Sequence, residues 1–328
     1  MKNSTPPTMI NYETAAKLLH EHDNFCILTH RSPDGDTVGC GFGLYYALTS
    51  IGKNACVLCS DEFPRRYNYL YGEYAGKRFN PGYIIAVDIA DTKLLGTELK
   101  KYADYIDLCI DHHHSNTHYA KNMLIEGDAA AACEVLYLLL EAAQIPITKL
   151  IAECLYTGIV TDSGCFKYPA TTAETHLIAA KLINTGIPYA YINRQVFETK
   201  SKQRIAIESY AISHMEYYLD EKCAFVSISN ELLLETGVKD DDLEGLAPLT
   251  TELETVEVGI LVKERDKGKF RVSMRSVKNT DVSSICSKFG GGGHYFAAGC
   301  MIEGTLPDIR MKLLKAVASV MGIDLWVI

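Results

Sequence analysis

Histidine and aspartate side chains with the spacing of metal ligands occur at the start of this chain. His30, Asp34 and Asp36 lie within seven residues of one another, in a segment where Pro33 and Gly35 disfavour both strand and helix. Because clustered carboxylates resist being ionised together, we expect a divalent cation to neutralise them. Oxygen ligands with a minority of imidazoles and no thiolate suit Mn²⁺ or Mg²⁺ better than a structural zinc.

The same residue types recur at the ends of two later apolar runs. Residues 83–87 are followed directly by Asp88, and residues 105–110 are followed by three such groups: Asp111, His112 and His113. Asp91 precedes a helical pattern and is interpreted as a helix cap, not as a ligand. The recurrence of acidic and imidazole groups at successive strand ends predicts one shared site.

Asp162 is a further carboxylate in an apolar stretch, beside Ser163 and Gly164. A buried carboxylate without a partner is costly, so Asp162 needs a metal ion, another cation or a set of backbone donors. The other acidic clusters favour a metal ion.

The segments that carry these groups predict a parallel sheet. Short apolar runs at residues 25–28, 54–59, 83–87 and 105–110 alternate with helical patterns over about the first 150 residues, which favours right-handed crossovers. In such sheets ligands bind outside the carboxyl ends of the strands. We therefore expect the predicted ligands to meet at one sheet edge.

A second domain is predicted because 328 residues exceed the usual size of one hydrophobic core. The helix-like segment at 198–213 is followed by strand patterns at 224–229, 255–263 and 269–274 and by an amphipathic helix at 306–320. The expected divisions are a metal-binding catalytic domain at 1–200, a helical linker at 201–215 and a smaller mixed α/β domain at 216–328.

The second domain contains four consecutive glycines, Gly290–Gly293. Such a loop lets backbone N–H groups approach a ligand closely, and phosphate is the usual partner. The flanking aromatic residues Phe289, Tyr295 and Phe296 are not typical of a flexible linker. Near the end of a predicted strand, Arg275 is expected to point inward and to hold a phosphate.

Composition limits the possible partners and the location. A net charge of −9 and a pI near 5.6 exclude a protein that coats nucleic acid non-specifically. No apolar run of about 18 residues occurs, so a membrane-spanning helix is not expected. Eleven cysteines without an export signal are typical of reduced thiols, and we expect a cytoplasmic protein.

With these motifs in place, the chain resembles the DHH phosphoesterase family over essentially its whole length. Within that family it is similar to the nano-RNases that also remove the 3′-phosphate of 3′-phosphoadenosine 5′-phosphate (pAp). The first motif matches as His30, Asp34 and Asp36, and the later ones match as Asp88, as Asp111-His112-His113 and as Asp162. Residues 281–300 resemble the associated DHHA1 C-terminal domain.

The resemblance implies a role for each matching residue. One metal ion would be held by His30, Asp34 and Asp88, and a second by Asp36, Asp88, His112 and Asp162. His113 would face the scissile phosphate, and Asp111 would orient an imidazole. The substrate would be held on the C-terminal domain by Arg275, Gly291, Gly292, Gly293 and His294.

The resemblance also implies the reaction. We expect hydrolysis of short oligoribonucleotides, about two to five nucleotides long, to mononucleotides, and of pAp to AMP. A hydroxide activated by two divalent cations would attack, Mn²⁺ being expected and Mg²⁺ the alternative, in the cleft between the domains. The expected partners are short RNA and nucleotide phosphates, and neither a membrane nor stably bound long nucleic acid is expected. The sequence does not decide whether the protein forms a homodimer.

Two other functions compete with this one. A stand-alone phosphodiesterase for linear or cyclic dinucleotides would use the same ligands. A non-catalytic nucleotide-binding protein would be expected to have lost at least one of the six predicted metal ligands, and all six are present.

Tyrosines alternate in the segment that follows Arg65 and Arg66. These tyrosines either stack on nucleic-acid bases or cover the edge of the sheet; they are Tyr67, Tyr69, Tyr71 and Tyr74. The sequence favours the second interpretation.

Overall fold

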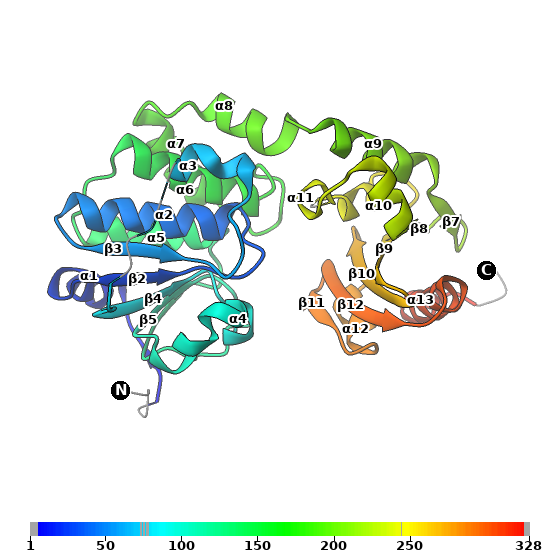
Figure 1. The fold of residues 1–328 in the computed structure, drawn as a ribbon, viewed down its shortest axis with the longest axis horizontal. Coiled ribbons are helices and arrows are strands. Elements are labelled where there is room, and N and C mark those ends of the chain that lie inside the picture. The colour runs from blue at the N-terminus through cyan, green and yellow to red at the C-terminus, as the bar shows by residue number, and fades with distance from the viewer. Residues whose placement is uncertain (1–5, 73, 75, 77–78, 244, 325–328) are drawn as a thin grey trace. The chain divides into compact units, whose positions relative to one another are not determined.

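The computed structural model describes residues 6–72, 74, 76, 79–243 and 245–324. The chain divides into two compact units, Met1–Thr199 and Lys200–Ile328, each with its own hydrophobic core (Figure 1). We describe each unit separately.

The first unit is built on a six-stranded sheet in which all neighbouring strands run parallel. Its strands are β1 (Thr8–Met9), β2 (Phe25–Leu28), β3 (Ala55–Leu58), β4 (Tyr83–Val87), β5 (Leu108–Asp111) and β6 (Asn122–Ile125). The strand order is β1-β6-β5-β4-β2-β3. Strand β4 therefore lies between β2 and β5, and the three strands that precede predicted ligands are adjacent.

Both faces of this sheet are covered. Alternate residues of β2 show this, because Phe25 and Ile27 belong to one core while Cys26 and Leu28 belong to another. The larger core is closed mainly by α1 (Tyr12–Glu21), α2 (Gly35–Ser50), α5 (Ala132–Ala142), α6 (Lys149–Asp162) and α7 (Ala173–Asn184). The shorter segments are η1 (Arg65–Tyr67), α3 (Asn68–Tyr71), η2 (Thr92–Leu95), α4 (Gly96–Leu99), η3 (Lys100–Tyr105), α8 (Tyr189–Asn193) and the π-helix η4 (Arg194–Glu198).

Glycines allow α2 and α6 to pack closely. A Cβ at Gly39 would collide with the carbonyl oxygen of Cys154 on α6, and one at Gly35 would collide with the Thr161 side chain. Only glycine leaves room for this approach. The close packing brings Asp36, in the first turn of α2, near the end of α6, where Asp162 is the last helical residue.

The second unit contains a mixed six-stranded sheet with the order β11-β12-β10-β9-β8-β7, in which only β8 and β9 pair in parallel among the described residues. Its strands are β7 (Glu216–Tyr218), β8 (Cys223–Ile228), β9 (Val258–Asp266), β10 (Lys269–Ser276), β11 (Gly292–His294) and β12 (Ala297–Glu303). Its helical segments are α9 (Lys202–Ser213), α10 (Asn230–Thr236), α11 (Asp240–Leu243), η5 (Ala247–Thr251), α12 (Val282–Ser287) and α13 (Leu306–Met321).

The residues of β10 alternate between the two faces of this sheet. Val272 and Met274 are buried in the core that contains Leu313 of α13. Arg271 and Arg275 lie on the opposite face and are at least partly exposed. The strand therefore presents cationic side chains on the side away from α13.

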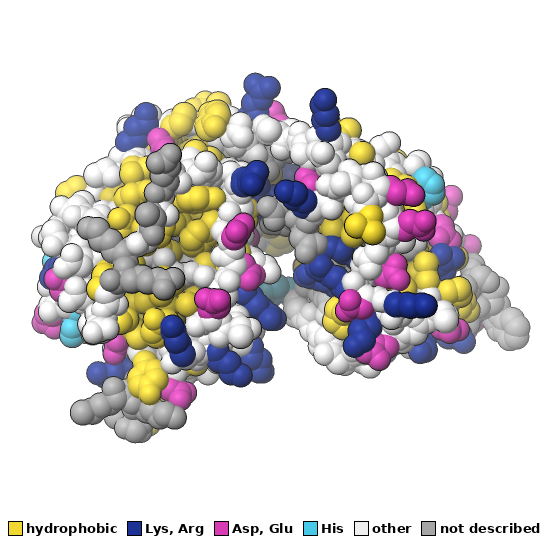
Figure 2. Space-filling model, in the orientation of Figure 1, with side chains coloured by type: hydrophobic (Ala, Val, Ile, Leu, Met, Phe, Trp, Pro, Cys, Tyr) yellow, Lys and Arg dark blue, Asp and Glu magenta, His cyan; other side chains and the backbone are white. Residues whose placement is uncertain are grey.

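The predicted α/β class is confirmed, with a parallel first sheet and a mixed second one. Several boundaries differ: the fourth predicted strand begins at Leu108 because residues 100–105 are helical, and the helix expected from residue 198 begins at Lys202. Among the described residues, no helix is long and apolar enough to cross a membrane. On the visible face, Lys and Arg side chains lie among Asp and Glu side chains without forming one continuous basic surface (Figure 2).

Candidate active site

The predicted ligands from three strand ends meet at the carboxyl edge of the first sheet. His30 follows β2, Asp88 follows β4, and His112 follows β5. Nε2 of His30 lies 3.5 Å from Oδ2 of Asp88 and 3.6 Å from Oδ1 of Asp34. These three side chains form the first group of donors whose atoms are close enough to share one cation.

A second group lies on the other side of Asp88. Nε2 of His112 is 3.2 Å from Oδ2 of Asp162 and 3.9 Å from Oδ2 of Asp36. The same nitrogen is 3.7 Å from Oδ1 of Asp88. Oδ2 of Asp88 thus faces His30, whereas Oδ1 faces His112 and also lies 3.7 Å from Nδ1 of His113, because β4 lies between β2 and β5.

Two atoms in this cluster have no hydrogen-bond partner although they are buried: Oδ1 of Asp88 and Nε2 of His112. Buried polar groups are normally paired, so atoms without partners that face each other indicate a ligand between them. Carboxylate oxygens with imidazole nitrogens are donors that Mn²⁺ and Mg²⁺ accept. The residues present therefore fit divalent cations.

The electrostatics of the cluster agree with this fit. Burial raises the pKa of Asp88 to about 6. Burial, reinforced by repulsion from Asp88 and Asp162, holds the pKa of Asp36 well above its usual range. Burial alone would lower the pKa of His112, but the surrounding carboxylates raise it to about 11. The carboxylates repel one another, and a cation would relieve that repulsion.

Hydrogen bonds to groups outside the cluster orient the side chains that could bind the metal ions. Nδ1 of His112 lies 3.1 Å from the carbonyl oxygen of Ala129, and Nδ1 of His30 lies 2.8 Å from that of Arg31. A carbonyl only accepts, so each Nδ1 donates, and in a neutral ring this leaves the Nε2 lone pair directed at the cluster. Asp36 accepts from the backbone N–H groups of α5 at Ala132 (2.6 Å) and Cys133 (3.0 Å).

Helix caps account for two other aspartates. Asp34 is the N-cap of α2 and accepts from the N–H groups of Asp36 and Thr37. Asp36 lies two residues later, in the first turn of α2, and faces His112. Asp91 caps η2, as predicted.

His113 is held by a pair of residues behind it. Its Nδ1 donates to Oδ1 of Asp111 at 2.7 Å, and the side chain of Asn116 donates to Oδ2 of the same carboxylate. Although burial opposes it, the bond to Asp111 raises the pKa of His113. Sequence reasoning missed Asn116, although a polar residue five positions after Asp111 marks the turn after β5.

Glycines inside the helices are the other residues that the sequence analysis missed. A Cβ at Gly158 would collide with Asp36 and Cys133, so this glycine leaves the space that the Asp36 carboxylate occupies. An isolated glycine inside a helical pattern was the available sequence signal, since it suggests close packing.

The predicted substrate-binding residues are brought together in the second unit. Arg275 of β10 and His294 of β11 both pair with Ala297 of β12, one on each side. Side chains in one such row lie on the same face of a sheet. Gly292 and Gly293 belong to β11, and Gly291 directly precedes it, with its N–H donating to the carbonyl oxygen of Cys286.

Three side chains considered in the sequence analysis or adjacent to a predicted ligand lie outside this chemistry. His114 is 78% exposed and faces Asp128, away from the buried cluster. Tyr67 is buried in the core and Tyr71 stacks on Phe42, so these tyrosines cover the sheet and do not present their rings to a base.

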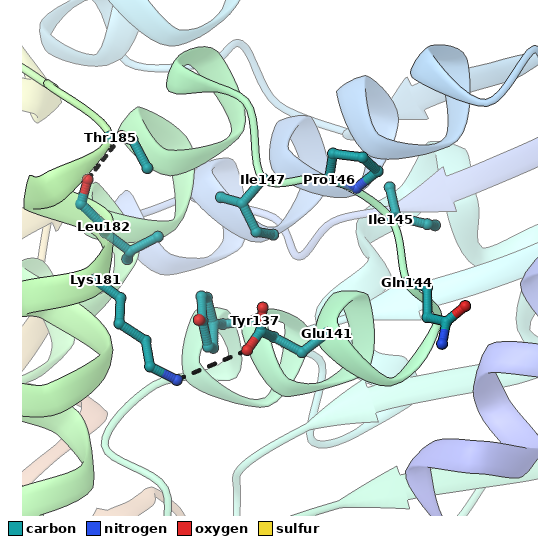
Figure 3. A pocket seen from close by; sticks show the side chains of 9 residues that line it. All are labelled: Tyr137, Glu141, Gln144, Ile145, Pro146, Ile147, Lys181, Leu182 and Thr185. Atoms are coloured by element: carbon teal, nitrogen blue, oxygen red, sulfur yellow. Dashed lines mark hydrogen bonds and ion pairs between the residues drawn. The ribbon is translucent and has the colours of Figure 1, made fainter.

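A separate cavity of about 510 Å³ lies between α5 and α7 (Figure 3). One wall is formed by Glu141 and Lys181, whose charged groups are 3.7 Å apart. None of the predicted site residues lines this cavity.

Comparison with known proteins places both units in described families. Residues 24–159 match the DHH family, N-terminal domain, and residues 221–322 match the DHHA1 domain. The chain is 28% identical to the bifunctional oligoribonuclease and PAP phosphatase NrnA of Thermus thermophilus, over 89% of this chain and 88% of that protein. It is 25% identical to the probable enzyme of the same name from Streptococcus mutans, over 89% and 93% respectively.

A solved structure shares the fold over nearly the whole length. An exopolyphosphatase-related protein from Bacteroides fragilis superimposes with a TM-score of 0.87 at 25% identity, covering 94% of this chain and 95% of that one.

Proposed function

Because the chain carries matches to the DHH family, N-terminal domain and to the DHHA1 domain, we propose that it hydrolyses phosphoester bonds in short oligoribonucleotides and in pAp. The observation that carries the proposal is Asp88, whose two oxygens face His30 and His112 in a buried cluster with unpartnered donor atoms. The names of the relatives from Thermus thermophilus and Streptococcus mutans describe both activities for those proteins.

The first unit would hold two divalent cations. Mn²⁺ is the expected ion and Mg²⁺ is the alternative. One set of ligands is His30, Asp34 and Asp88, and the other is Asp36, Asp88, His112 and Asp162. When bound, the cations would supply Lewis acidity at the phosphate and lower the pKa of nearby water. The oxygen-rich donor set supports this assignment.

His113 would stabilise charge on the phosphoryl group. The hydrogen bond between Nδ1 and Asp111 fixes the direction of the ring. A fixed imidazole costs little reorganisation as charge develops on the phosphoryl oxygens. Asp111 acts through His113 and is a positioning residue.

The second unit would hold a phosphate that is not cleaved. Arg275 and His294 lie in one row of the sheet, and Gly291, Gly292 and Gly293 form the adjacent segment, where the lack of side chains lets a phosphate approach the backbone. We assign catalysis to residues 1–200, the helical linker to 201–215 and substrate holding to 216–328.

The test is product release by the purified chain with Mn²⁺. The substrates are pAp, a linear RNA dinucleotide, a cyclic dinucleotide, pyrophosphate and a long single strand, each with the wild type and Asp88→Ala. Hydrolysis of the first two that disappears in the variant supports the proposal. Preference for the cyclic dinucleotide would identify a cyclic-dinucleotide phosphodiesterase, and inactivity of a folded, Mn²⁺-loaded chain on all five would identify a nucleotide-binding protein.

A further inference from the structure

Two aromatic residues form the turn between β11 and β12. His294 and Ala297 are the last paired residues of the hairpin, so Tyr295 and Phe296 make up the whole turn. Two-residue hairpin turns ordinarily carry Asn, Asp or Gly. Tyr295 is nevertheless 45% exposed and Phe296 44% exposed.

Packing of the hydrophobic core does not explain these side chains. Phe289, at the other end of the glycine loop, packs against the core of the second unit, whereas the rings of Tyr295 and Phe296 contact each other, with centroids 4.8 Å apart. Large, partly exposed aromatic groups that lie outside the hydrophobic core are typical of binding surfaces.

The turn is held in a defined position by hydrogen bonds. The Tyr295 hydroxyl donates to the carbonyl oxygen of Asn279 at 3.0 Å. The carbonyl oxygens of Tyr295 and Phe296 accept from the N–H groups of Val282 and Ser276, also at 3.0 Å. The exposed rings therefore belong to an ordered segment, and presenting them to a ligand requires little ordering.

The position of the turn indicates what the ligand is. Tyr295 directly follows His294, and the carbonyl of Phe296 bonds the residue that follows Arg275. The aromatic faces thus lie beside the two side chains assigned to a phosphate. A nucleoside phosphate joins an anion to a flat π-system through one sugar, and nucleobases stack on aromatic side chains whatever their sequence.

We propose that Tyr295 and Phe296 form a stacking platform for a nucleobase, so that the second unit selects nucleoside phosphates over phosphate esters that lack a base. The inference rests on the proposed function, because it assigns the substrate class of the same phosphate site. Selection by stacking is expected to be tolerant of base identity.

The test compares the binding of AMP and ribose 5-phosphate by titration calorimetry, using the full chain in EDTA to remove the metal ions. The variants are Phe296→Ala and Phe296→Leu, of which the second keeps apolar bulk but lacks an aromatic face. Tyr217→Ala is the matched control, because Tyr217 is 43% exposed on β7, at the opposite edge of the same sheet.

The wild type and Tyr217→Ala are expected to bind AMP about tenfold more tightly than ribose 5-phosphate, a typical effect of one stacked base. Both Phe296 variants are expected to lose most of this preference while binding ribose 5-phosphate unchanged. Equal affinities in the wild type, no binding of either ligand, or equal weakening of both in the variants would overturn the inference.

The mass of the protein assembly in solution is a second measurement. If the Phe296 variants change this mass but bind AMP with unchanged affinity, the turn belongs to a protein contact and the inference is overturned. The proposed function is tested by a different measurement, the hydrolysis of pAp with Mn²⁺, so its failure can be told apart from failure of the stacking platform. Hydrolysis with equal affinities for the two ligands would defeat the stacking platform alone.

Discussion

The Asp111 carboxylate lies 2.7 Å from Nδ1 of His113 and fixes the direction in which the imidazole points. Asp111→Asn replaces a pure acceptor by an amide that both donates and accepts, so the ring loses its fixed orientation. We expect kcat on pAp to fall about 100-fold, with KM changed about twofold or less. Steady-state kinetics of Asp111→Asn and His113→Ala measure this.

His114→Ala is the control for that pair, since His114 adjoins His113 in sequence but is exposed and faces Asp128. Its kinetics are expected to match the wild type. An effect of His114→Ala as large as that of His113→Ala would contradict the assigned role.

Asp88→Asn separates metal binding from folding. The substitution removes a carboxylate whose burial raises its pKa to about 6, so in EDTA the variant is expected to be at least as stable as the wild type. Mn²⁺ at about 100 times its Kd should stabilise the wild type by about 2.7 kcal/mol and the variant by much less. Thermal unfolding with and without Mn²⁺ tests both statements, and an equal Mn²⁺ shift in the two proteins would refute the assignment of Asp88.

Two glycines of α2 offer a matched comparison of packing. A Cβ at Gly39 collides with the Cys154 carbonyl, whereas one at Gly43 meets the nearest side-chain atoms at 3.4 Å, an ordinary contact. We expect Gly39→Ala to cost about 1–3 kcal/mol of unfolding free energy. Gly43→Ala should be neutral or stabilising by about 0.5–1 kcal/mol, because alanine favours a helix. Denaturant unfolding measures both, and similar values for the two variants would show that the helices can separate without cost.

The glycine loop allows a similar distinction between folding and binding. A Cβ at Gly291 collides with the carbonyl oxygen of Gly299, but one at Gly292 meets no protein atom within 4 Å. Gly291→Ala should lower the melting temperature. Gly292→Ala should leave it unchanged yet raise KM for pAp about tenfold, if a phosphate occupies the space. An unchanged KM in Gly292→Ala would remove that residue from the substrate site.

Glu208 supplies a pH-dependent contribution near the start of the second unit. Its carboxylate is 2.8 Å from Lys200 and 2.6 Å from Arg204, and although burial opposes them, these cations lower its pKa. The stabilisation is fully present above the ordinary glutamate pKa of about 4.3 and is lost as the pH falls through the lowered value.

Glu208→Gln should therefore cost about 1 kcal/mol at neutral pH and much less in acid. Unfolding curves across that range test this, with Glu235→Gln, exposed on α10, as the control. A cost that stays constant with pH would mean that the ion pairs do not contribute.

The sequence was informative where structure is local. The apolar run that ends at Leu28 and the one at residues 83–87 appear as strands with the predicted bounds, because buried parallel strands are continuously apolar. Strands β1 and β11 have two and three residues, which are too few for any periodicity to reveal them.

The candidate ligands were also predictable, because their residue types and their positions after strands are local features. The interactions that position these ligands were not predictable from the sequence. The bond from Asn116 to Asp111 depends on the conformation of the turn after β5, and the room that Gly158 leaves for Asp36 depends on how distant segments pack. Sequence patterns specify which groups are present, whereas their orientation is a property of the assembled core.

The division of the chain into two units also separates two kinds of evolutionary change. All proposed metal ligands lie between His30 and Asp162, and all proposed substrate-holding residues lie between Arg275 and Phe296. Substitutions in the second unit can therefore alter which phosphate compound is accepted while the hydrolytic groups stay intact. The fold allows new specificities to arise without rebuilding the chemistry.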